Sequence, residues 1–196
     1  VVWQALPSQR ARDRQRSLGW LIALTMVLNG LWLVTVQFLS VWATVVCIIL
    51  LLAALVITYL RAVRTREPAD GWLDGILIDV VTGLHLGWVA LATVANIAAA
   101  LTATVPADWE SAASVVGVIV LIVIVVAAVA LGISASGGWR IAPVLSIAWG
   151  LGWLAVARLL GDLVDVPIGI TAIIVAVVVI IVPVVGRLMR ERTLAD

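Results

Sequence analysis

The sequence predicts an all-α fold, a polytopic membrane bundle with six transmembrane helices. Of its 196 residues, 64% are hydrophobic and only 12% are charged, whereas roughly half of a soluble domain is apolar. The apolar residues also gather in six runs, each long enough to cross a lipid bilayer as a helix rising ~1.5 Å per residue. The expected spans are Leu18–Phe38, Val41–Leu60, Gly75–Thr104, Ala113–Ile133, Ile141–Leu160 and Ile168–Met189.

The ends of these runs carry residues that start or stop helices. The first span follows an arginine-rich segment, and the turn before the second is very short. Pro106 ends the third span, and the small residues of 134–138 close the fourth. Pro143 and Pro167 open the fifth and sixth spans. Pro183 falls inside the sixth, where we expect a kink about one turn earlier.

The distribution of charge predicts the orientation of the chain. All twelve basic residues are arginine, and in the six-span order only Arg158 falls near the side that carries Asp108, Glu110, Asp162 and Asp165. Basic residues mark the cytoplasmic side. We therefore expect a multi-pass protein of the cell (inner or plasma) membrane with both ends of this chain cytoplasmic. The eleven arginines on the predicted cytoplasmic side are Arg10, Arg12, Arg14, Arg16, Arg61, Arg64, Arg66, Arg140, Arg187, Arg190 and Arg192.

Polar side chains recur along the central span. His85, Trp88, Ala92 and Asn96 follow one another at spacings of three, four and four residues, so we expect them on one helix face. Hydrocarbon offers no hydrogen-bond partner, so this face must meet protein, water or a ligand. We also expect Asn29 and Asn96 to be structural, each bonding to a neighbouring helix.

Two acids begin the central span. An acid at membrane depth is costly, so we expect Asp79 to be paired or to face water. One interpretation makes Asp79 a functional acid on a proton or substrate path. The other, which we favour, places Asp74 and Asp79 in the headgroup zone beside Arg61 and Arg64.

Four of the ten tryptophans lie deep in their helices. These are Trp32, Trp88, Trp149 and Trp153. They either pack helices together, with each indole N–H bonded to a carbonyl, or wall a pocket for a flat apolar ligand.

The segments TMVLNGLWLVTVQF and GLHLGWVALATVAN resemble the TspO/MBR family, the tryptophan-rich sensory or translocator proteins. In that family an asparagine stands three residues before a tryptophan, as Asn29 and Trp32 do here, and a later helix matches Trp88, Ala92 and Asn96. The resemblance covers about Leu18 to Ala100. Leu84 and His85 depart from it, because the family has proline and tyrosine there.

The resemblance implies a sensor, receptor or transporter that binds a flat hydrophobic ligand, a porphyrin or haem-type tetrapyrrole. It divides the chain into an arginine-rich cytoplasmic segment (1–17), which begins like the end of a preceding helix, a TspO/MBR-like three-helix region (18–104) and an additional three-helix region (105–196). One or two of the family's N-terminal helices would then be missing. The expected ligand-binding residues are Trp32, His85, Trp88, Ala92, Asn96, Trp149 and Trp153. The alternative is an accessory or structural subunit, or a small-molecule transporter without tetrapyrrole binding; a homodimer or a membrane-complex partner stays open.

The sequence contains no catalytic constellation, so we do not expect an enzyme. One histidine and one cysteine are too few for a metal site, and no cofactor is required. Cys47 is expected to be a small buried hydrophobe. His85 either packs helices, or bonds to a propionate, or ligates a haem iron axially. A net charge of +1 favours no nucleic-acid partner.

Overall fold

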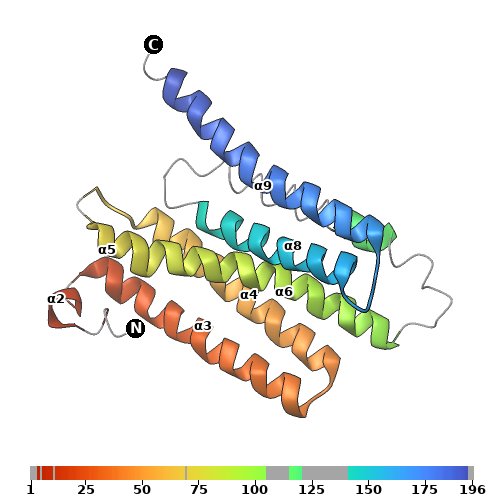
Figure 1. Ribbon diagram of the computed structural model, residues 1–196. Coiled ribbons are helices and arrows are strands. Elements are labelled where there is room, and N and C mark those ends of the chain that lie inside the picture. Colours follow the sequence, from red (N-terminus) through yellow and green to blue (C-terminus); the bar gives the residue numbers. More distant parts are fainter. Residues whose placement is uncertain are drawn as a thin grey trace. The chain divides into compact units, whose positions relative to one another are not determined.

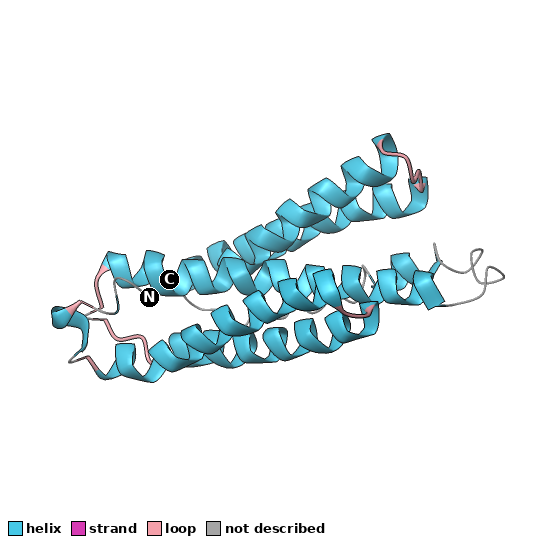
Figure 2. Cartoon of the chain, turned by 90° about the horizontal axis from the view of Figure 1, so that it is seen from below, coloured by secondary structure: helices cyan, strands magenta, loops and turns pink. Residues whose placement is uncertain are grey.

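The computed structural model of the chain describes residues 4, 6–10, 12–68, 70–104, 115–120 and 141–193. In these ranges the regular structure is helical, with no strand (Figure 2). Five of the helices are long and apolar enough to cross a membrane, which confirms the all-α membrane bundle. The fourth expected span lies outside the described residues, apart from 115–120, which are helical.

The chain divides into two compact units, Val1–Ala103 and Thr104–Asp196. In the first unit α3 and α4 lie side by side and run in opposite directions, and α6 returns along α4 (Figure 1). In the second unit α8 (Ala142–Leu160) packs against α9 (Val166–Thr193). The helices of the first unit are α2 (Pro7–Arg10), α3 (Asp13–Phe38), α4 (Val41–Arg64), α5 (Trp72–Asp74), the π-helix η1 (Gly75–Val80) and α6 (Val81–Thr104).

Two helices extend further into charged sequence than the apolar runs predict. Helix α3 begins at Asp13 instead of Leu18, and α4 continues to Arg64 instead of ending at Leu60. Arginine and glutamine are good helix formers, and the long arginine side chain can carry its charge away from apolar surroundings. The end of an apolar run therefore does not have to be the end of a helix. Helix α9 likewise continues through Pro183, and the kink expected there stays a prediction.

The central span does not begin as a regular α-helix. Residues Gly75–Val80 form a π-helix, in which the amide of Val81 donates to the carbonyl of Ile76, five residues back. A π turn holds one residue more than an α turn, and such turns are frequent at functional sites. The extra residue changes the direction in which the side chains on either side of η1 point.

The core of the first unit joins three helices. Leu51 and Leu55 of α4 pack with Leu86 and Val89 of α6, and Trp32 of α3 packs against this cluster from the side. Burying side chains of this size stabilises the bundle by roughly 1.5–3 kcal/mol each, counted from water. Cys47 is buried, as predicted.

Candidate functional site

Buried charges gather at one end of the first unit. We call this group the ion-pair cluster; its members are Arg12, Arg14, Arg66, Asp70, Asp74 and Asp79. Nη2 of Arg14 donates to Oδ1 of Asp79 at 2.6 Å, and Nη1 of Arg12 donates to Oδ2 of Asp74 at 2.7 Å. Arg66 forms a second ion pair with Asp79, and Arg12 one with Asp70. Three arginines therefore balance three aspartates.

Arg14 lies at the centre of the cluster. Its side chain is only 6% exposed, and it also donates to Oδ1 of Asp74 at 3.3 Å and to the carbonyl of Ala62 at 3.1 Å. Its Nε lies 3.5 Å from Oδ2 of Asp70, an ion pair without hydrogen-bond geometry. The hydrogen bond to Asp74 raises the pKa of Arg12 above its usual value. Arg14 thus joins α3, α4 and the start of the central span.

The acids are paired, but not with the arginines that we expected. Asp79 is paired, as predicted for an acid at this depth. Arg61 and Arg64, which we expected beside these acids, are exposed on α4, and neither forms an ion pair with a described carboxylate. The N-terminal turn of α3 supplies Arg14 instead.

An apolar layer separates this cluster from the interior. Leu18, Ala62 and Ile78 are almost fully buried against one another, and Ile22 packs on them from the inner side. Ile22 also lines a cavity, which lies on the far side of the apolar layer from the ion-pair cluster. The ion-pair cluster and the apolar layer therefore close one end of that cavity.

The cavity lies between α3, α4 and α6 and has a volume of about 340 Å³, near the lower end of the range of ~300–1,000 Å³ for small-molecule sites. We call it the polar cavity, because five of its ten lining residues are polar. Its exposed lining residues, Met26, Gly30 and Val81, mark an open side between α3 and α6. The lining consists of Ile22, Thr25, Met26, Asn29, Gly30, Leu55, Thr58, Val81, Thr82 and His85.

Two of the polar lining groups are satisfied by the protein, and three are not. Thr25 and Thr58 donate their hydroxyls to the carbonyls of Ile22 and Ala54 in their own helices. Within the described part of the chain, Asn29, Thr82 and His85 make no side-chain hydrogen bond. Thr82 is 93% buried. In an apolar bundle each unpaired polar group costs several kcal/mol, so this lining calls for a polar partner.

Asn29, Thr82 and His85 come from two helices, and spacing explains their convergence. Thr82 stands three residues before His85 on α6, and Asn29 stands four residues after Thr25 on α3, so each pair shares a helix face. We expected Asn29 to bridge two helices, and the threonines were not among the expected site residues. Hydroxyl and amide groups at these spacings are the signal that could have found the cavity.

Asn96 lies deeper in the first unit and holds two helices together. Its Oδ1 accepts from the indole Nε1 of Trp32 at 3.4 Å, and its Nδ2 donates to the carbonyl of Ala92 at 3.0 Å. The first of these bonds joins α6 to α3, as a bridging role for Asn96 requires. Asn29 makes no such bond to a described residue, and its bridging role stays a prediction.

The change Asn96→Leu should lower the free energy of unfolding only modestly. Hydrogen bonds between membrane helices are worth about 0.6 kcal/mol on average and ~1.7 kcal/mol at most. The measurement is a thermal melt of the detergent-solubilised protein, with Trp32→Phe as the matched control that removes the same bond from the other side. A loss of folded protein for Asn96→Leu alone would contradict a purely bridging role.

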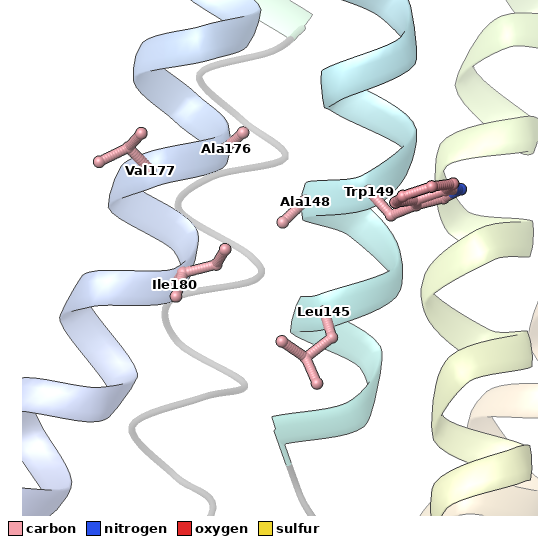
Figure 3. Close-up of a pocket in the computed structure, with 6 residues that line it drawn as sticks. All are labelled: Leu145, Ala148, Trp149, Ala176, Val177 and Ile180. Atoms are coloured by element: carbon pink, nitrogen blue, oxygen red, sulfur yellow. The ribbon is translucent and has the colours of Figure 1, made fainter.

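The remaining predicted site residues do not line the polar cavity. Trp88 is 51% exposed on the side of α6. Trp149 and Trp153 belong to the second unit and stack edge to face, with ring centroids 5.9 Å apart. Figure 3 shows Trp149 at a shallow apolar groove between α8 and α9, with its ring turned away from α9.

Comparison with known families agrees with this bundle. The profile of a family described as TSPO-like protein matches residues 1–185. The chain belongs to the TSPO-like family. It is a multi-pass membrane protein of the TspO type, from a family that is generally non-enzymatic. The match extends well beyond the segment from Leu18 to Ala100 on which the resemblance first rested. No curated protein and no solved structure matches the chain.

Proposed function

We propose that this TSPO-like protein binds a flat, largely apolar ligand in the polar cavity, and that the ligand is a porphyrin or haem-type tetrapyrrole. The observation that carries the proposal is the convergence of Asn29, Thr82 and His85, three unpaired polar groups, on one cavity inside an apolar bundle. A bound molecule with a polar edge would satisfy them, and its apolar faces would contact Ile22 and Leu55. Sensing and transport are both compatible with such binding.

The lining also indicates how such a ligand would enter. The open side between α3 and α6 lies at membrane depth, so an apolar molecule could reach it from the bilayer. The cavity is smaller than a whole tetrapyrrole, so the ring would enter only as far as its centre, beside His85, and the rest would lie along the outer surface near Met26. No arginine lines the cavity, so the carboxylates of a tetrapyrrole would stay at the open side.

The test is a titration of the intact, detergent-solubilised protein with protoporphyrin and with haem, followed by absorption and tryptophan fluorescence. We expect saturable binding, and we expect Gly30→Leu to weaken it at least tenfold. Gly30 lines the cavity, and a Cβ added there meets no atom within 4 Å, so a leucine would narrow the open side of the cavity.

Gly19→Leu is the matched control for this change. Gly19 lies in the same helix, also meets open space, and does not line the cavity. If neither compound binds saturably to the unchanged protein, tetrapyrrole binding fails and the subunit interpretation takes its place. If both leucine variants bind as the unchanged protein does, the ligand lies elsewhere.

We also propose that the end holding the ion-pair cluster faces the cytoplasm of a cell membrane, because the arginines gather there. Reporter fusions after Arg66 and at the C-terminus should therefore read cytoplasmic. A fusion within 161–165, which carries Asp162 and Asp165, should read extracytoplasmic. A cytoplasmic signal from that loop would contradict this orientation.

A further inference from the structure

Among the described side chains at the charged end of the first unit, two arginines are left out of its ion pairs. Arg12, Arg14 and Arg66 pair within the ion-pair cluster, and Arg16 pairs with Asp13. Arg61 and Arg64 are exposed, and neither forms an ion pair with a described carboxylate. Their positive charge is therefore available to a partner outside this chain.

Their position on α4 indicates what that partner is. Arg61 and Arg64 stand three residues apart in the last turn of the helix, so they lie on one face. On the same side, one turn further into the membrane span, Ile57 is 55% exposed and Leu60 is 41% exposed. This side of α4 thus runs from an apolar stripe to a pair of cations. The apolar side chains would face the acyl chains of a phospholipid, and the two cations would face its headgroup.

The charges favour an anionic lipid over a zwitterionic one. Guanidinium groups bind phosphate through two parallel hydrogen bonds, and two of them on one face can neutralise a headgroup that carries net negative charge. The nearest acid along the chain is Glu67, three residues beyond Arg64 and exposed. Helix α4 is also the most apolar candidate span of the first unit, so its exposed apolar side chains suit the acyl chains of a lipid.

We propose that Arg61 and Arg64 bind the phosphate of an anionic phospholipid whose acyl chains lie along Ile57 and Leu60. This site is separate from the polar cavity, and the proposal does not depend on tetrapyrrole binding. Each arginine near a bilayer surface strengthens binding by about fivefold. The pair should therefore strengthen binding of the lipid roughly thirtyfold.

The experiment measures binding of fluorescent phosphatidylglycerol to the full chain in neutral detergent micelles by fluorescence anisotropy. The double variant Arg61→Gln/Arg64→Gln should bind roughly thirtyfold more weakly than the unchanged protein. The control Arg16→Gln/Arg158→Gln removes the same net charge from an exposed arginine of α3 and a half-buried arginine of α8, neither of which belongs to α4, and should change binding less than threefold.

Two comparison probes make the test specific. Phosphatidylcholine should bind at least tenfold more weakly than phosphatidylglycerol, and inorganic phosphate should not displace the lipid at millimolar concentration. Equal loss in both double variants would show a general charge effect and overturn the proposal. Displacement by inorganic phosphate would also overturn it, because the site would then hold free phosphate and not a lipid.

Discussion

Asp79→Asn is expected to lower the free energy of unfolding by about 3–5 kcal/mol, the largest effect on stability that the structure predicts. The carboxylate is 5% exposed and pairs with Arg14 and Arg66. Removing its charge leaves an excess positive charge in a buried site, and the desolvation cost of that charge is no longer compensated. Thermal melts of the detergent-solubilised protein would measure the change.

A second variant separates this explanation from a general loss of folding. Asp79→Asn combined with Arg66→Gln restores the charge balance, because Arg14 keeps Asp70 and Asp74, so part of the lost stability should return. Arg16→Gln removes an exposed pair with Asp13 and should cost no more than ~1 kcal/mol. A cost for Asp79→Asn as small as that of Arg16→Gln would contradict a buried, charge-balanced cluster.

The helices could be predicted from the sequence because the bilayer sets both their length and their composition. A run such as Val41–Leu60 has only one way to satisfy its backbone in hydrocarbon, which is to form a helix. The π-helix of Gly75–Val80 could not be predicted in this way. One additional residue in a turn leaves the composition and length of an apolar run unchanged, and only the packing against neighbouring helices reveals it.

Of the four residues predicted to share one face of α6, only three point in nearly the same direction. At ~100° per residue, Ala92 and Asn96 lie within ~20° of the direction of His85, but Trp88 lies ~60° away. His85 accordingly lines the polar cavity and Asn96 bonds to Trp32, whereas Trp88 reaches the exposed side of the helix. Spacings of three and four residues indicate a shared side, and the exact angle decides which side chains meet.

Ion-pair partners from distant parts of the chain were harder to predict than which residues share a helix face. Asp79 is separated from Arg14 by 65 positions, and nothing in either local sequence gives the depth at which the two meet. The arginines expected beside Asp79 were near it in the chain, but they point outward on α4. That a buried acid needs a cation could be predicted from the sequence, because burying an unpaired charge is costly at any site. Which cation it would be depended on how α3 packs.

His85→Ala is expected to have the largest effect on ligand binding. Within the proposed function, the neutral imidazole of His85 can ligate a haem iron, and the polar cavity offers no other histidine or cysteine for this role. Haem should therefore bind at least tenfold more weakly to the variant, a loss of ~1.4 kcal/mol or more. The affinity for metal-free protoporphyrin should change less than threefold, because that compound has no iron for His85 to ligate.

Trp88→Ala is the matched control for His85→Ala, since both truncate a large side chain on α6 and Trp88 does not line the cavity. It should leave both affinities within threefold of those of the unchanged protein. Equal weakening of haem and protoporphyrin by His85→Ala would contradict axial ligation and indicate hydrogen bonding or shape. If Trp88→Ala lost binding and His85→Ala did not, the ligand would lie on the exposed side of α6. Stacking on the indole of Trp88 would then hold it there, and such stacking contributes about 0.5–1.5 kcal/mol beyond burial.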